Sequence, residues 1–449
     1  MKRFVCLVAG LLMVLPGCSS DDDSATLATT EPTTDVGTST DAGGTTDIAV
    51  ATDTGALEAD TTLGTSDVTS PEPDVPAGET AADVHRALLA HLAENVIIPT
   101  YSDFLAATET LVTATAAYAV SPDASGQAQA RLAFGEAMNL WQMAEVMQIG
   151  PAGSMTSALG GQDLRDEIYS WPSVNSCRVD QEVVEQAYTD VAAFGEELTN
   201  VRGLDALEYL LYPPETGNGC KASSSINKNG DWEAVVASGE LEARRAAYSA
   251  TLASLLAEEA SALVDLWTQG DGKFSDVLAT AGKGSEIYET AHDGLNAVSD
   301  AMFYVEKITK DMKLAMPAGI NGCEEDICPG DLESQHAKRS ALNVRFNIVG
   351  LQVLFHGGDQ DNDLPGFDDL LIARGESTLA EDMTNKLAAA REVAVTVAKT
   401  SSYAELLESE PQKVVEVHSA LKAFTALMKT EFVSILDLAL PQSAAGDND

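Results

Sequence analysis

The chain has 449 residues, 45% of them hydrophobic and 6% aromatic, which is enough for two to three domains with sizeable cores. It contains 26 basic and 70 acidic residues, which gives a formal net charge of −44 at pH 7. A surface this negative repels nucleic acids, so we exclude them as partners, and it also repels anionic lipids. Contact with a membrane therefore requires an anchor, whereas cations and basic ligands are attracted.

Residues 1–18 are typical of a secretory signal. Lys2 and Arg3 form a positive start, and the apolar run over residues 4–15 is too short to span a bilayer. The sequence therefore predicts an exported protein.

The signal ends in the lipobox pattern of bacterial lipoproteins, Leu15-Pro16-Gly17-Cys18. Cleavage before Cys18 would leave this cysteine at the N-terminus with its thiol for lipidation, and a fully acylated cysteine anchors stably. An ordinary signal peptide with an incidental cysteine is the alternative. Because Ser19 stands where an aspartate would retain some lipoproteins at an inner membrane, we expect a lipid-anchored protein of the outer membrane, on its periplasmic or surface face.

Residues 19–81 are predicted to form a disordered acidic linker. Between residues 19 and 80 there are 14 acidic side chains and no Lys or Arg, and apolar residues are isolated. Such a segment cannot bury enough surface to offset its chain entropy, and its charges repel one another. We expect it to hold the folded part away from the membrane.

From residue 82 onward apolar residues recur at helical spacing, and no convincing stretch alternates with period two. Pro99 should kink or restart the first helix. The predicted fold class is all-α, with two bundles of long antiparallel helices over residues 82–230 and 231–440 and a disordered tail over 441–449. The other helices are expected near residues 127–148, 181–199, 203–212, 231–268, 284–315, 331–356, 376–399 and 411–439, with an ordered loop over 152–180.

Four cysteines remain after the signal and the anchor. Cys177 and Cys220 lie in the first half, and Cys323 and Cys328 lie in the second. An even number in an exported protein predicts disulfides, and local pairing within each half is the simplest arrangement. A four-cysteine zinc site is the alternative, although the spacing is poor for it.

Asp205 and Glu208 are three residues apart in a segment with helical periodicity, so they share one face of a helix. Beside a buried stripe, two such carboxylates could supply oxygen ligands to a metal ion. They could equally be surface charges, since many helices carry such pairs.

The segment resembles the imelysin family at its signature Gly-x-His-x-x-Glu, which here is Gly203-Leu204-Asp205-Ala206-Leu207-Glu208. Other segments follow the family's order along the chain. They are Val96-Ile97-Ile98-Pro99-Thr100-Tyr101, Trp141 with Glu145, Ile168-Tyr169-Ser170-Trp171-Pro172, Cys177-Arg178-Val179-Asp180, Asp311-Met312-Lys313-Leu314 and Asn347-Ile348-Val349-Gly350-Leu351.

The resemblance implies an all-helical, two-domain fold, an exported location and an association with iron uptake. It places the site around the signature helix, where Gly203 and Glu208 match and Asp205 replaces the histidine. Histidine titrates near neutrality and is a nitrogen ligand for zinc, whereas we expect an aspartate to be ionised and to suit calcium, magnesium or ferric iron. The replacement therefore argues against zinc-dependent peptidase chemistry.

Further candidate residues lie outside the signature. Glu145 is expected to join the metal ligands, with Asp180 as another option. If Glu145 is buried it needs a partner, either Arg178, Arg202 or a cation. The remaining candidates are His356, as a metal ligand or a helix-end charge, and the alternating acids Asp359, Asp361 and Asp363, as a partial calcium loop or a polar turn.

Three functions are consistent with this sequence. The first is a non-catalytic protein that binds a metal ion (iron, calcium or zinc) or a metal complex during metal acquisition, together with an uptake protein of the membrane. The second is a metallopeptidase that uses Glu208. The third is a helical interaction scaffold in which Asp205 and Glu208 only form internal contacts.

Overall fold

The computed structural model describes residues 80–214, 217–359, 364–442 and 444, and in these ranges the chain forms helices and no strands. The predicted all-α fold class is confirmed. The predicted signal, Cys18, nearly all of the acidic linker and the end of the tail lie outside the described residues. None of the described helices is long and apolar enough to cross a membrane.

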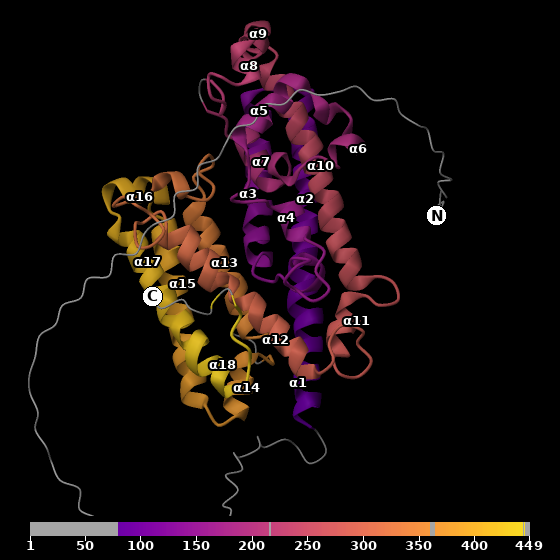
Figure 1. The fold of residues 1–449 in the computed structure, drawn as a ribbon, viewed down its shortest axis with the longest axis vertical. Helices are drawn as coiled ribbons and strands as arrows, with labels where there is room; N and C mark the ends of the chain where they lie inside the picture. The colour runs from indigo at the N-terminus through magenta and orange to yellow at the C-terminus, as the bar shows by residue number, and fades with distance from the viewer. Residues whose placement is uncertain (1–79, 215–216, 360–363, 443, 445–449) are drawn as a thin grey trace, which may run out of the picture. The chain divides into compact units, whose positions relative to one another are not determined.

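The first half of the described chain contains long helices joined by short ones (Figure 1). These are α1 (Ala81–Leu92), α2 (Ile98–Val120), α3 (Ala124–Ala144), α4 (Leu164–Ile168), α5 (Ser176–Glu185), α6 (Val191–Phe194), α7 (Gly203–Leu211), α8 (Ser225–Lys228), α9 (Asp231–Ser238), α10 (Leu241–Thr268) and α11 (Phe274–Ala279).

The second half begins with α12 and a π-helical segment over Val305–Ala315. Its helices are α12 (Ala291–Met302), α13 (Ser340–Phe355), α14 (Phe367–Ala373), α15 (Ser377–Ala398), α16 (Tyr403–Ser409), α17 (Gln412–Leu427) and α18 (Val433–Ile435).

Two groups of helices make up most of this fold. In the first helix group, α2 packs against α3 and α10, and α10 packs against α7. In the second helix group, α15 packs against α13 and α17, and the π-helical segment packs against α17 and α13. Helix α13 also packs against α3, which joins the two groups. Helix α10 follows the domain boundary predicted near residue 230 and packs in the first helix group; the division into two domains stays a prediction.

The chain forms these helices where apolar side chains recur at the spacing of one helix face. In α17, Val414, Val417, Leu421 and Phe424 are all completely buried, as their 3-4 spacing predicts. At the start of α2, Pro99 lies in the first turn and follows a π-helical turn over Ala93–Ile97. A proline in a first turn removes a backbone N–H that has no partner within the helix, so the helix restarts there, as predicted.

Some helix boundaries differ from those predicted. The helix expected over 181–199 begins earlier, because the Asn175 side chain accepts a hydrogen bond from the backbone N–H of Arg178. It ends at Glu185, where Gln186 adopts a left-handed conformation. The helix expected over 331–356 begins only at Ser340, and residues 332–339 form a loop instead. We call it the 332–339 loop, and it contributes to the site.

Candidate functional site

The signature helix α7 is enclosed by protein on every side, and all nine of its residues are buried. It starts at Gly203, which has a positive φ of 79°, and an added Cβ would lie 2.8 Å from the carbonyl oxygen of Ile168. A glycine is therefore required both for the backbone conformation and for the close approach of α4. This explains why the first position of the signature is a glycine.

Glu208 points from α7 at the 332–339 loop. Its Oε1 accepts hydrogen bonds of 3.0 Å from the backbone N–H groups of His336 and Ala337, and its Oε2 accepts one from the Ser334 hydroxyl. The side chain is 2% exposed. Burial raises the pKa of Glu208 to about 7, even though these hydrogen bonds act in the opposite direction.

Asp205 lies one turn earlier on α7 and is 6% exposed. Its Oδ2 accepts a hydrogen bond of 3.0 Å from the Ser170 hydroxyl, and its Oδ1 accepts one from the backbone N–H of Ala206. Burial raises the pKa of Asp205 to about 7. The expectation of a fully ionised aspartate therefore needs revision, because a pKa near 7 makes this carboxyl titrate near neutrality, as the replaced histidine would.

Glu145 is completely buried just after α3, and its partners differ from those expected. Arg165 donates two hydrogen bonds to its Oε1, of 2.8 and 3.1 Å, and the ammonium of Lys313 lies 3.2 Å from its Oε2. Arg202 pairs with Glu167 instead, and Arg178 pairs with Glu182. Burial opposes ionisation of Glu145, but Lys313 and Arg165 outweigh it and lower the pKa of Glu145.

Lys313 extends from the π-helical segment into the space between the two helix groups and is completely buried. Its ammonium contacts four oxygen atoms, which we call the oxygen cage. They are Gln142 Oε1 at 2.7 Å, Glu333 Oε1 at 2.8 Å, Asn347 Oδ1 at 3.0 Å and Glu145 Oε2 at 3.2 Å.

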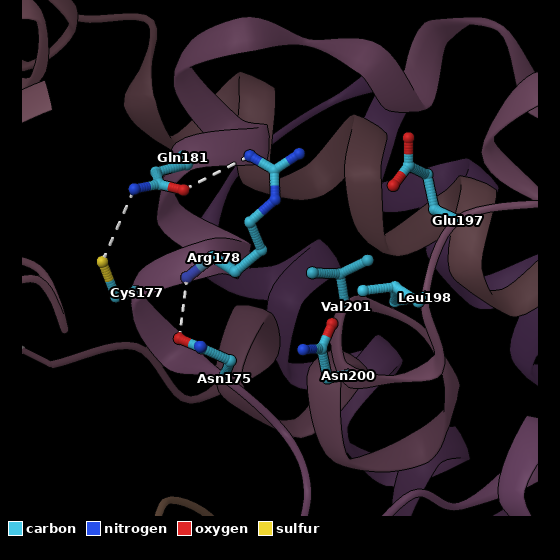
Figure 2. Close-up of a pocket in the computed structure, with 8 residues that line it drawn as sticks. All are labelled: Asn175, Cys177, Arg178, Gln181, Glu197, Leu198, Asn200 and Val201. Carbon is cyan, nitrogen blue, oxygen red and sulfur yellow. Dashed lines mark hydrogen bonds between the residues drawn. The ribbon is translucent and has the colours of Figure 1, made fainter. Parts of the chain in front are cut away.

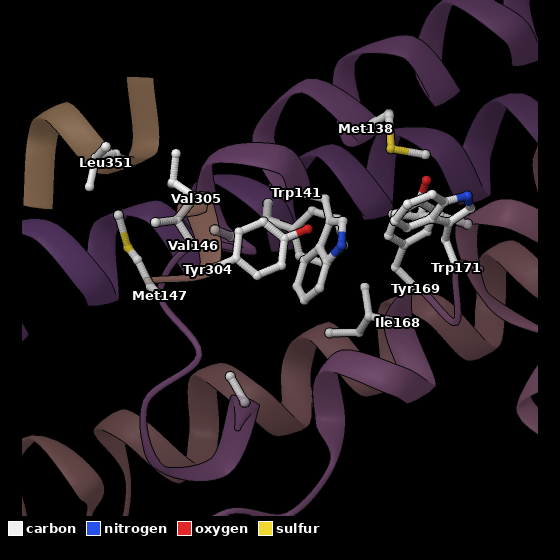
Figure 3. Close-up of a cluster of buried hydrophobic side chains, with 14 of the residues drawn as sticks. Met138, Trp141, Val146, Met147, Ile168, Tyr169, Trp171, Tyr304, Val305 and Leu351 are labelled. Atoms are coloured by element: carbon white, nitrogen blue, oxygen red, sulfur yellow. The ribbon is translucent and has the colours of Figure 1, made fainter. Parts of the chain in front are cut away.

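Aromatic side chains surround this polar interior. The Lys313 ammonium lies 5.4 Å from the ring centroid of Tyr304 and 5.8 Å from that of Trp171. The Tyr169 hydroxyl donates a 2.8 Å hydrogen bond to Glu333. Figure 3 shows these three rings with Trp141 in one buried cluster. The aromatic side chains keep water away from the ionised groups, so the charges must be balanced by the protein itself.

The predicted site residues are only partly brought together. Asp205 and Glu208 share one face of α7, and the electrostatic influence of both reaches Tyr169, together with that of Glu145 and Glu333. Asp180 belongs to a different contact, where it accepts hydrogen bonds from the Tyr209 hydroxyl and the Gly219 N–H. Sequence reasoning missed the roles of Lys313, Glu333 and Arg165, because charged residues are mostly exposed and their burial depends on partners that only the fold brings to them.

The remaining candidates lie away from α7. His356 is buried, and its Nδ1 lies 2.7 Å from a carboxylate oxygen of Asp368, so it has an internal partner. Of the acids predicted as a partial calcium loop, Asp359 is exposed, and Asp361 and Asp363 lie outside the described residues.

The signature carboxylates do not fit a metal ion in this arrangement. Among the residues that the structure describes, no three His, Cys, Asp or Glu side chains converge so as to hold one. The oxygens of Asp205 and Glu208 already accept hydrogen bonds, and those of Glu145 face Arg165 and Lys313. A metal ion would have to displace these donors, and it would have to compete with the proton that a carboxyl with a pKa of about 7 partly retains at neutral pH.

Three hollows among the described residues are candidate binding sites. The largest of them, of about 810 Å³, lies between the loop over 148–159, α12 and the start of the π-helical segment, and Pro441 and Gln442 border it. A second, of about 590 Å³, lies between α2 and α3. The smallest, of about 190 Å³, lies beside Cys177, where Arg178 reaches toward Gln181 (Figure 2). The first two have the volume of a typical small-molecule site, and the first also brings together distant segments of the described chain.

The four cysteines form two disulfides, Cys177–Cys220 and Cys323–Cys328. The predicted local pairing is confirmed, and the four-cysteine zinc site is wrong. The first disulfide fastens the segment after α7 to α5, and the second closes a short loop after the π-helical segment.

Comparison with known proteins identifies relatives over most of the chain. The family model Peptidase_M75, described as Imelysin, matches residues 97–430. Iron-regulated protein A of Synechococcus elongatus is 22% identical over 317 residues, which cover 70% of this chain and 76% of that protein.

Two solved structures have a similar fold. One is a putative iron-regulated protein A precursor from Parabacteroides distasonis, with a TM-score of 0.60 and 14% identity over 82% of this chain and 97% of that one. The other is an imelysin-like protein from Psychrobacter arcticum, with a TM-score of 0.55 and 16% identity over 81% and 98%. At these identities the likeness establishes the fold alone.

Proposed function

Because the chain belongs to the imelysin family, we propose that it acts in iron acquisition outside the cytoplasm, as a non-catalytic protein that binds an iron complex. The name of the relative from Synechococcus elongatus supports the link to iron, and the signal with its lipobox supports the location. The observation that carries the proposal is the 810 Å³ cavity, which is large enough for a chelated metal ion.

The lining of this cavity suits a ligand with an apolar body and a positive charge. Ile149, Phe303 and Ile308 supply apolar surface, and Asp300 supplies a carboxylate. The lining also contains Lys307, whose positive charge is paired with Asp311. The buried hydroxyl of Tyr288, which also lines the cavity, has no hydrogen-bond partner there. A cationic chelate of ferric iron would complement these groups, and the net charge of −44 would attract it.

A bare metal ion at α7 is the weaker form of this proposal, because Asp205 and Glu208 are already engaged as acceptors. A metallopeptidase is weaker still, since it requires a metal-bound water or a nucleophile at this helix. The enclosed carboxylates leave no room for a peptide: they are 6% and 2% exposed. We therefore assign α7 an internal role and place the ligand in the cavity.

The proposal includes a tether to the membrane. Cys18 would carry the lipid, the acidic linker would hold the folded part away from the bilayer, and a membrane protein of metal uptake would receive the ligand.

Calorimetric titration of the full chain in detergent tests the proposal. Ferric desferrioxamine B, a cationic chelate, is the probe, and ferric citrate is the anionic comparison. We expect binding of the cationic chelate, and at least a tenfold loss of affinity in Ala297→Trp, which fills the cavity, and in Asp300→Asn, which removes the charge. Asp331→Asn, at an exposed acid outside the cavity, is the matched control. No binding by the wild type, or equal binding by the cavity variants, would refute the proposal.

A further inference from the structure

The oxygen cage has the composition of a site for a hard metal cation, although an ammonium lies in it. It contains two carboxylates, Glu145 and Glu333, and two amide oxygens, from Gln142 and Asn347. Carboxylates and side-chain amides are the ligands that bind calcium in proteins. All four residues are completely buried, so the cage is separated from solvent.

The four contacts come from parts of the chain that only the fold brings together. Gln142 and Glu145 lie at the end of α3, Glu333 in the 332–339 loop, and Asn347 on α13. The amide nitrogen of Asn347 donates to the backbone carbonyl and to Oε1 of Gln142, which turns the Asn347 oxygen toward the ammonium. The cage is thus oriented by the protein and does not depend on flexible side chains.

The distances in the cage match an ammonium and not a metal ion. The four N–O separations of 2.7–3.2 Å fall in the range of hydrogen bonds and ion pairs. Calcium would require separations of about 2.3–2.6 Å. The side chains therefore surround the larger group, with a spacing that suits Lys313.

The charges in this interior are balanced without a metal ion. Lys313 and Arg165 bring two positive charges against the two negative charges of Glu145 and Glu333. The second oxygen of Glu333, Oε2, is buried with no hydrogen-bond partner among the described residues, so this carboxylate retains an unused lone pair. A divalent cation would use that oxygen, whereas an ammonium with three protons leaves it free.

We propose that Lys313 is a built-in cation: its ammonium occupies an oxygen cage that would bind a divalent metal ion if the lysine side chain were absent. The charge of Lys313 balances the carboxylates of the oxygen cage, so the fold does not require a metal ion there. The ammonium also excludes metal ions from the cage, because it fills the space and repels other cations. This inference goes beyond the proposed function, because it concerns the oxygen cage and not the ligand cavity.

Truncation of the lysine tests the inference directly. Lys313→Ala removes the ammonium and opens space, and Lys313→Met removes the charge but fills the space. With 5 mM Ca²⁺ as the probe, we expect the melting temperature of Lys313→Ala to rise by at least about 5 °C, and those of the wild type and Lys313→Met to stay within about 1 °C. Equilibrium dialysis with ⁴⁵Ca²⁺ should show one additional bound ion in Lys313→Ala, which Glu333→Gln in the same chain removes.

An equal response of Lys313→Ala and the wild type to Ca²⁺ would overturn the inference. A calcium ion bound to the wild type and displaced by Glu333→Gln would also overturn it.

If Lys313→Ala fails to fold with and without Ca²⁺, a double-mutant cycle between Lys313→Met and Glu333→Gln tests the inference instead. Lys313→Met should then lower the melting temperature less in the Glu333→Gln background than in the wild type; an equal loss contradicts the built-in cation. None of these readouts involves an iron chelate, so failure of the proposed function is distinguishable from failure here.

Discussion

The hydroxyl of Ser334 donates a hydrogen bond to the carboxylate of Glu208 across 126 residues of sequence. Together with the N–H groups of His336 and Ala337, this contact fastens α7 of the first helix group to the 332–339 loop. The signature glutamate therefore has an internal partner for each of its oxygens. Its role in this chain is to hold two parts of the fold together.

Truncation of Glu208 should destabilise the protein strongly. Glu208→Ala leaves two backbone N–H groups and the Ser334 hydroxyl without an acceptor, at about 1–3 kcal/mol for each buried donor. We expect the free energy of unfolding to fall by at least about 3 kcal/mol in a urea titration. Glu208→Gln keeps one acceptor oxygen and should lose less. Equal stability of Glu208→Ala and the wild type would contradict the joining role.

The stability of the fold should decrease as the pH rises from about 4.5 to about 7. Burial raises the pKa of Asp205 and of Glu208 to about 7 from ordinary values of 3.8 and 4.5. The folded state therefore binds more protons than the unfolded state in this window, so it is favoured at the acidic end and this contribution is lost toward pH 7.

Urea titrations at several pH values measure this effect. Asp205→Asn and Glu208→Gln should each flatten the dependence of the unfolding free energy on pH, while Asp331→Asn, at an exposed acid, should leave it unchanged. A slope that neither variant alters would show that other groups cause it.

The enclosed signature predicts no peptidase activity at α7. A casein digest with the wild type and with Glu208→Gln, each with and without Zn²⁺, should give equal and background rates. The Glu208→Gln variant is preferred to alanine because it preserves an acceptor at this position. A zinc-dependent rate that disappears in Glu208→Gln would establish catalysis and refute the non-catalytic assignment.

The two disulfides should contribute unequally to stability. Cys177–Cys220 closes a separation of 43 residues and Cys323–Cys328 one of 5. On the chain-entropy model their removal costs about 4 and about 2 kcal/mol. Paired serine substitutions measured by urea unfolding test this order; the reverse order would mean that the short loop restrains more of the unfolded chain than its length implies.

The lipobox predicts a lipid on Cys18. When the protein is produced in a bacterium with a lipoprotein pathway, radioactive palmitate should label the wild type, and the protein should sediment with membranes. Cys18→Ser should be unlabelled and should appear in the soluble fraction. Cys6→Ser serves as the control, because that residue leaves with the signal. Labelling of Cys18→Ser would exclude this anchor.

The sequence alone determined the local features of this protein. Apolar residues at 3-4 spacing place α17, a proline restarts the helix at α2, and Cys323 pairs with Cys328 five residues later, because each of these depends on short-range geometry. The pairing of Cys177 with Cys220 followed from the even number of cysteines and their distribution between the two halves. The order of segments along the chain was enough to indicate the family. The signature position was also evident, since Gly203, Asp205 and Glu208 lie within one helix.

Only the tertiary structure decided what those residues do. Lys313, Glu333 and Arg165 are separated from α3 and α7 by tens to hundreds of residues, and their local sequence does not reveal which partners they meet in the interior. The protonation of Asp205 depends on how completely the fold removes water from it. Burial and long-range charge are properties of the packed chain, so a carboxylate that looks ionised and ready for a metal in the sequence becomes an internal contact with a raised pKa in the fold.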